Sequence, residues 1–114
     1  MPRYAHLFQR LKEAVLDGRG ETPPELRRAA AARSSGLGGG PAAAALADDL
    51  PADLRAYVDT IARHAHRVTG EDVDALRRAG WSEDAIFEIS ISAALGAGMA
   101  RLERGLAALR GEEP

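Results

Sequence analysis

The chain has 114 residues and a formal net charge of −2; 46% of its residues are hydrophobic, but only 4% are aromatic. This length fits one domain with a modest core, which Ala, Leu, Ile and Val must fill. The charge provides no excess of positive groups to attract nucleic acid or an anionic membrane. Because the chain contains no cysteine, disulfides, thiolate metal sites and thiol-based catalysis are excluded.

The N-terminal residues 1–6 do not resemble the apolar part of a signal peptide, and no stretch approaches about 18 consecutive apolar residues. We therefore expect a cytoplasmic protein without a membrane partner. Alanine and arginine are abundant, whereas Lys12 is the only lysine. This composition indicates a bacterial source with a GC-rich genome.

Two helices are predicted in the first third of the chain. Apolar residues recur at helical spacing over 3–16, and the turn-forming residues 17–20 end that pattern. Thr22 is the expected cap of a second helix over 23–33, with Glu25 completing a capping box. Since the face of this second helix is mostly alanine, we expect it to pack lightly.

Residues 34–41 are rich in glycine and serine and end in proline. A glycine-rich loop can cradle a phosphate, but the spacing here fits neither GxGxxG nor GxxxxGK[ST], and no lysine follows. The segment therefore predicts a flexible linker.

A third helix is predicted from Leu50-Pro51, with an apolar stripe of Leu54, Val58, Ile61, Ala65 and Val68. Thr69 is the expected cap of a short helix that ends at Gly80 in a left-handed conformation. Trp81 is then expected to fold back and anchor the corner.

The longest predicted helix begins at the cap Ser82 and ends near Arg110. One broad face carries Phe87, Ile91, Ala94, Leu95, Gly98, Leu102, Leu106 and Leu109. The opposite face carries Ile86, Ile89, Ala93, Ala97 and Ala100. A chain this small cannot cover both faces, so we expect a homo-oligomer, most simply a dimer. No segment shows the alternation of a strand, and the predicted fold is all-α, with this helix central and C-terminal.

Four residues are candidates for a functional site beside the third helix and the start of the long helix. His64 and Glu88 are the candidate proton-handling groups, since a histidine titrates near neutral pH and burial can raise the pKa of a glutamate toward that range. Tyr57 and Trp81 are the candidate ligand-binding residues. The alternative is structural: His64 as a hydrogen-bonded boundary residue, and Glu88 as a partly exposed acid or one paired with an arginine.

No metal or cofactor site is predicted. His64 and His66 would point about 160° apart on a helix, so they cannot grip one ion together. A helix–glycine turn–helix outline over 72–86 resembles a DNA-binding motif, but its second helix opens with Glu83 and Asp84. These acids would repel a phosphate backbone, so no nucleic-acid partner is expected.

Residues 68–88 read VTGEDVDALRRAGWSEDAIFE, and the small-residue helix that follows ends in Arg101-Leu102. This pattern, over roughly residues 50 to 110, resembles the carboxymuconolactone decarboxylase and alkylhydroperoxidase D-like superfamily. The resemblance implies a helical core over 48–114, preceded by N-terminal helices and a linker over 1–47. It also implies assembly through the long helices.

Peroxidase-type members of that superfamily use a CxxC pair, a histidine and a glutamate relay. The corresponding positions here are Ala65 to Val68 and Asp72, so a thiol peroxidase is not expected. The resemblance then implies a non-redox protein that binds a small molecule or performs cysteine-independent, decarboxylase-type chemistry. The alternative is a non-catalytic helical scaffold or partner-binding subunit.

Overall fold

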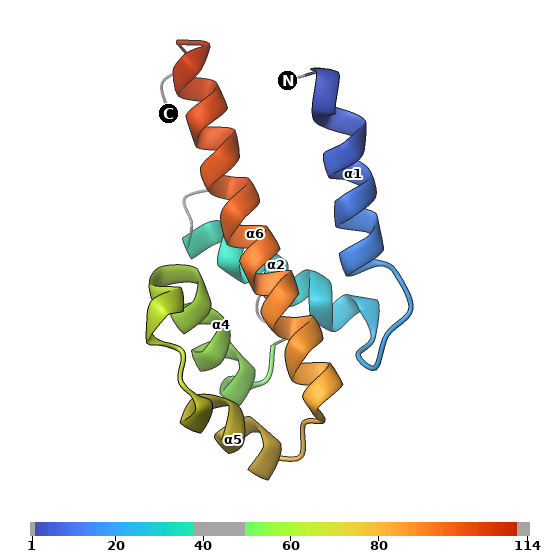
Figure 1. Ribbon diagram of the computed structural model, residues 1–114, viewed down its shortest axis with the longest axis vertical. Coiled ribbons are helices and arrows are strands. Elements are labelled where there is room, and N and C mark those ends of the chain that lie inside the picture. The colour runs from blue at the N-terminus through green and yellow to red at the C-terminus, as the bar shows by residue number, and fades with distance from the viewer. Residues whose placement is uncertain (1, 38–49, 112–114) are drawn as a thin grey trace.

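The computed structural model describes residues 2–37 and 50–111, which are helical apart from short connections (Figure 1). The helices are α1 (Pro2–Leu16), α2 (Pro24–Leu37), α4 (Ala52–His64), the 3₁₀ turn η1 (Ala65–Arg67), α5 (Gly70–Arg78) and α6 (Glu83–Leu109). No strand occurs in these two ranges. The predicted all-α fold with a long C-terminal helix is therefore confirmed.

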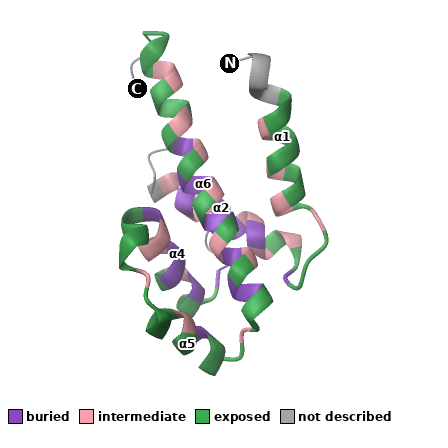
Figure 2. Cartoon of the chain, viewed as in Figure 1, coloured by how far each residue is buried: buried purple, intermediate pink, exposed green. Residues whose placement is uncertain are grey.

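Helix α6 runs along most of the molecule, which measures 47 × 27 × 25 Å, and α2 crosses behind it (Figure 1). Helices α4 and α5 pack on one side of its first half, while α1 extends alongside its second half. The buried residues concentrate where α2, α4 and α6 meet (Figure 2). The side chains of Leu54, Val58 and Ile89 are the largest apolar ones that are fully buried there.

The predicted ends of α5 and α6 are confirmed in detail. Thr69 and Asp72 form a reciprocal capping box at the start of α5. Gly80 ends that helix with a φ of 107°, in the left-handed region that a glycine adopts without strain. Ser82 then caps α6 by accepting a hydrogen bond of 3.1 Å from the Ala85 N–H.

The expectation that the second helix packs lightly is wrong. Ala29, Ala30 and Ala31 are buried, and the backbone of α2 lies directly against that of α6. A Cβ atom added at Gly96 of α6 would fall 2.8 Å from the Cα of Ala31. Small side chains on both helices therefore do not weaken the contact, because they allow the two backbones to approach closely.

The segment predicted as a linker also differs. Helix α2 continues to Leu37, so residues 34–37 are helical; the rest of the predicted linker, 38–41, lies outside the described residues. Ser34 faces inward in this extension and is fully buried. Glycine and serine in 34–37 therefore do not end α2, because this part of the helix packs against the core.

Candidate functional site

The hydroxyl of Tyr57 lies 2.7 Å from Ser90 Oγ and joins α4 to α6. Ser90 Oγ also lies 2.7 Å from the Ile86 carbonyl, to which it donates. A serine hydroxyl has one proton, so Tyr57 is the donor to Ser90. Since Tyr57 is only 8% exposed, this bond stabilises the contact between the two helices.

Trp81 follows the Gly80 corner and connects it to α4. Its backbone N–H donates to the Leu76 carbonyl at 3.1 Å, which closes the end of α5. Its indole N–H donates to Asp53 Oδ2 at 2.8 Å, and its side chain packs partly buried against the core. The expected anchoring of the corner is confirmed, with Asp53 of α4 as the polar partner.

His64 is exposed at the C-terminal end of α4. The chain leaves the α-helix there, with a φ of −147° at His64, so the helical angle expected between His64 and His66 does not apply. Their ring centroids lie 5.9 Å apart, edge to face. Within the described part of the chain, no group of three or more His, Cys, Asp or Glu side chains could hold a metal ion.

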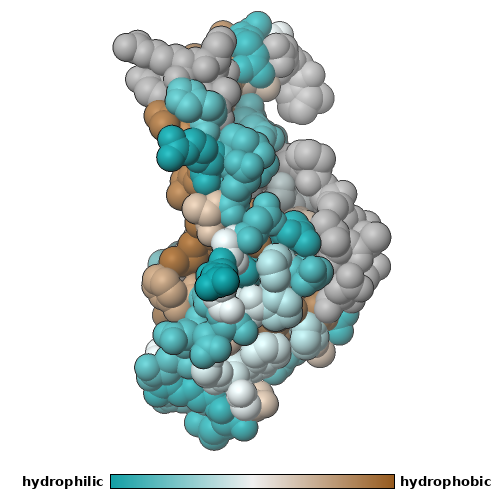
Figure 3. All heavy atoms as spheres, turned by 90° about the vertical axis from the view of Figure 1, so that its right-hand side faces the viewer, coloured by the Kyte–Doolittle hydropathy of each residue, from teal (hydrophilic) through white to brown (hydrophobic). Residues whose placement is uncertain are grey.

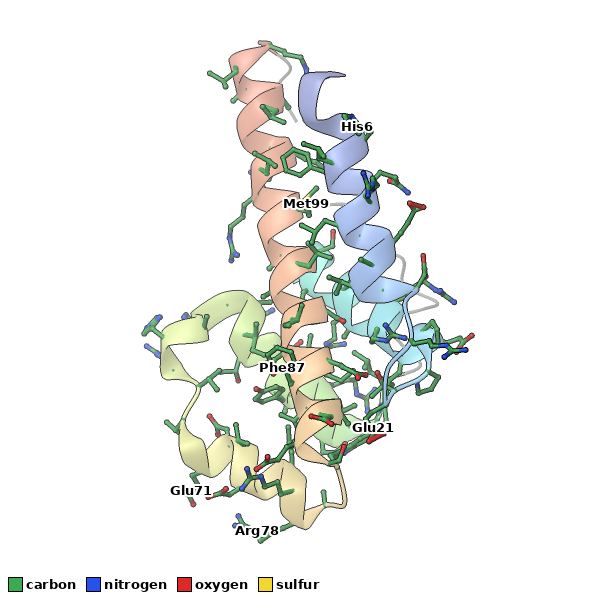
Figure 4. All side chains as sticks on the ribbon, turned by 45° about the vertical axis from the view of Figure 1, so that its right-hand side comes forward. His6, Glu21, Glu71, Arg78, Phe87 and Met99 are labelled. Carbon is green, nitrogen blue, oxygen red and sulfur yellow. The ribbon has the colours of Figure 1, made fainter. Side chains whose placement is uncertain are left out.

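The carboxylate of Glu88 binds the connection between α1 and α2. Its Oε2 accepts from the Glu21 N–H at 2.7 Å, and its Oε1 accepts from the Thr22 N–H at 2.8 Å and the Thr22 hydroxyl at 2.6 Å. Figure 4 shows Glu21 next to the first turns of α6. A Cβ atom at Gly20 would fall 2.6 Å from Glu88 Oε2, so glycine there makes room for the carboxylate.

These bonds correct the expected start of the second helix. The sequence predicts Thr22 as its cap, but the Thr22 hydroxyl donates to Glu88. The first helical carbonyl is that of Pro23, which accepts from Leu26 at 3.0 Å. Helix α2 therefore begins at Pro24, one residue later than expected.

The pKa of Glu88 is lower than its ordinary value. Partial burial raises this pKa, but the hydrogen bonds from Thr22 and Glu21 and the nearby charge of Arg27 together outweigh burial. The suggestion that burial raises the pKa toward neutrality is therefore wrong. Glu88 is ionised at neutral pH and serves as a hydrogen-bond acceptor.

Arg27 completes the same polar network, and no local sequence pattern indicates this role. Its guanidinium is buried and donates to the carbonyls of Val15 at 2.7 Å, Gly18 at 2.5 Å and Thr22 at 3.3 Å. Together, Arg27 and Glu88 hold the α1–α2 connection against α2 and α6. An arginine near a helix start ordinarily indicates a solvated residue, because an inward orientation depends on where the preceding loop lies.

Several hollows lie on the surface of the described residues, among them one beside α4 and another beside α6. One, of about 210 Å³ between α4 and α5, is lined by Asp53, Ala56, Tyr57, Thr60, Asp72 and Leu76 among others. The second, of about 310 Å³, lies between α1, α2 and α6, and Lys12, Leu16, Ala31, Leu95, Met99 and Glu103 are among its lining residues. Of the four candidate site residues, Tyr57 alone lines the first hollow, and none lines the second.

Comparison with protein-family models, with curated proteins and with solved structures found no match. The resemblance to the carboxymuconolactone decarboxylase and alkylhydroperoxidase D-like superfamily therefore rests on the sequence pattern described above.

We predict that Glu88→Gln lowers the free energy of unfolding at pH 7 by about 2 kcal/mol, because the amide places a donor against the N–H groups of the loop. Since the folded pKa of Glu88 is lowered, its carboxylate stabilises the fold fully above the unfolded value of about 4.3. This stabilisation is lost as the pH falls through the lower, folded pKa.

Urea unfolding from pH 7 to pH 3 tests the prediction. The difference between wild type and Glu88→Gln should stay constant down to about pH 5 and shrink below about pH 4. Glu103→Gln, an exposed change on the same helix, is the matched control and should have little effect. A constant difference down to pH 3 would contradict the proposed role of the carboxylate.

Proposed function

We propose that this chain is a non-catalytic helical module that assembles as a homodimer through one uncovered face of α6. The observation that carries the proposal is a continuous stripe on that helix, called here the open face. Its members are Phe87, Ile91, Ala94, Gly98, Leu102, Gly105 and Leu109. All are exposed except Leu102, which is half-buried.

The bulky members of the open face are unusually accessible for apolar side chains. Phe87 is 63% exposed, Ile91 37% and Leu109 85%. Apolar residues gather along the left edge of the molecule in Figure 3, which is the side that faces the viewer in Figure 1. The opposite face of α6 is buried within the chain, with Ile86, Ile89, Ala93, Ala97 and Ala100. Contiguous exposed apolar surface of this kind marks an interaction site.

The size of the surface indicates that α1 contributes to it. From Phe87 to Leu109 the open face is about 33 Å long and, on a helix about 10 Å wide, provides less than the roughly 800 Å² per partner of a stable interface. Leu7 and Leu11 of α1 are 49% and 47% exposed, beside the second half of α6 (Figure 1). These leucines enlarge the apolar surface that a partner subunit can cover.

Three of the four candidate site residues support a structural role. Tyr57, Trp81 and Glu88 each join one element of the chain to another by hydrogen bonds. The hollow beside Tyr57 is lined by Asp53 and Asp72, and these carboxylates would repel an anionic lactone acid. The resemblance to a superfamily that assembles through long helices agrees with the proposal.

Light scattering on the purified chain at micromolar concentration tests the assembly. We expect a species of twice the 12.1 kDa chain mass, and we expect Ile91→Glu to be monomeric with unchanged helix content, because it buries a charge at the interface. Ala79→Glu, an exposed change directly after α5, should leave the dimer intact. A lone monomer of the wild type would overturn the proposal.

A lipid surface is the competing occupant of the open face. By length and composition alone, α6 could span a membrane. However, 44% of its most apolar stretch is buried inside the chain, and core helices of soluble proteins meet the same criteria. Vesicle flotation decides between the two. If the wild type floats with vesicles as a monomer and Ile91→Glu does not float, the open face binds a membrane and the proposed dimer is wrong.

A further inference from the structure

We infer that the two α6 helices of the dimer pack antiparallel, about a two-fold axis that passes Gly98. This inference rests on the proposed dimer and specifies its geometry. In a two-fold interface, if residue i of one subunit meets residue j of its partner, then j also meets i. The open face has the spacing that this symmetry requires.

The members of the open face are arranged symmetrically about Gly98. Phe87 and Leu109 lie 11 residues from it, Ile91 and Gly105 lie 7 residues away, and Ala94 and Leu102 lie 4 residues away. In the antiparallel arrangement, Ile91 therefore meets Gly105 of the partner subunit, and Ala94 meets Leu102 of the partner subunit. At both places a bulky side chain faces a small one, as close helix packing requires.

The glycines of the open face have no evident purpose within the chain. A glycine inside a helix costs about 1 kcal/mol relative to alanine. At Gly96 the contact with α2 explains the residue, but a Cβ atom at Gly98 or Gly105 would meet nothing within 4 Å. Neither residue has a positive φ. Close approach of a second helix to the open face accounts for both.

The dipole of α6 favours the antiparallel orientation. Antiparallel packing about Gly98 places the positive N-terminal end of one helix, at Glu83, beside the negative C-terminal end of its partner. Parallel packing would place like ends together. Because these helix ends are exposed, the electrostatic difference between the two orientations determines the orientation of the dimer more than it increases the affinity between the subunits.

Helix α1 extends the same surface. Phe8 and Lys12 line the groove that α1 forms with the second half of α6. Leu7 and Leu11 each precede one of these residues, and one step on a helix is about 100°. This rotation turns both leucines away from the groove, in agreement with their exposed fractions of 49% and 47%. An antiparallel partner would bring its Phe87 end to this edge, against Leu7 and Leu11.

Cysteine cross-linking of the full chain tests the axis, since the wild type contains no cysteine. Under mild oxidation, Gly98→Cys should link to Gly98→Cys of the partner subunit in high yield. Two copies of the same residue bring their Cα atoms within the roughly 4.4–6.8 Å of a disulfide only at the two-fold axis. Phe87→Cys alone should not link, since two copies would lie about 33 Å apart. A mixture of Phe87→Cys with Leu109→Cys should link, and this mixture leaves Gly98 intact.

The outcomes separate the geometry from the assembly. Self-linking of Phe87→Cys would show a parallel pair and overturn the inference while keeping the dimer. A dimer in which neither Gly98→Cys nor the mixture links would overturn it as well. Linking of Glu71→Cys, exposed on α5, to the same yield would show random collision and count against it. A monomeric wild type would overturn the proposed function itself.

A second measurement uses Gly98→Leu. The open space at Gly98 and the better helix propensity of leucine predict a monomer at least as stable as wild type. The dimer dissociation constant should rise by about tenfold or more, because the side chain separates the helices at the axis. Unchanged association would overturn the inference.

Discussion

Replacing Gly96 with alanine is expected to lower the free energy of unfolding by about 3 kcal/mol, a large part of the total stability of a small domain. The added methyl group would strike the backbone of α2, 2.8 Å from both the Cα and the carbonyl carbon of Ala31. A side chain could rotate away, but a helix backbone must shift as a unit. The shift would also separate Ala29 and Ala30 from the core in which they are buried.

Urea unfolding monitored by circular dichroism measures this effect, with Gly70→Ala as the matched control. A Cβ atom at Gly70 meets nothing within 4 Å, and the residue lies in the first turn of α5. The control should therefore change stability by less than about 0.5 kcal/mol. If Gly96→Ala unfolds at the same urea concentration as wild type, α2 and α6 do not touch as closely as described.

Helix boundaries were predictable because their signals are local. Thr69, Gly80 and Ser82 act through hydrogen bonds or backbone angles within four residues of themselves, and the sequence shows those neighbours directly. The separation of α6 into two apolar faces was equally accessible, since it follows from helical periodicity alone. Periodicity could not say which face is buried, because both are apolar.

Tertiary contacts were harder to predict, as the alanines of α2 illustrate. An alanine-rich face is compatible with weak packing or with very close packing. The difference depends on whether a glycine lies opposite, and here that glycine is Gly96, 65 residues after Ala31. No local pattern connects the two positions.

The same limit applies to the candidate site. The sequence indicates that Glu88 is an unusual acid inside an apolar helix, but its partners Glu21 and Thr22 lie more than 60 residues away. The direction of its pKa shift depends on those donors, so sequence alone could not predict it. His64 was placed by helical phase on a helix that ends at that residue, which is why its exposure differs from the expected boundary position.

Removing the Arg27 guanidinium is expected to have the second large effect. Its side chain, buried between α2 and the α1–α2 connection, donates to the carbonyls of Val15, Gly18 and Thr22. Methionine preserves much of the apolar volume but supplies no donor, so these carbonyls lose their bonds to the guanidinium. Each lost bond lowers the free energy of unfolding when the carbonyl is shielded from water. Lysine would not rescue the contact, because one ammonium group cannot reproduce the planar fork of donors.

We therefore expect Arg27→Met to lower the free energy of unfolding by about 3 kcal/mol and Arg27→Lys to lower it nearly as much. The adjacent Arg28 is the matched control: its ion pairs with Asp17 and Glu25 are largely exposed, so Arg28→Met should cost less than about 1 kcal/mol. Since the charge of Arg27 also helps to lower the pKa of Glu88, Arg27→Met should reduce the dependence of stability on pH below about pH 4. Equal urea midpoints for Arg27→Met and Arg28→Met would show that the buried guanidinium does not hold the connection, and that Glu88 alone fastens it to α6.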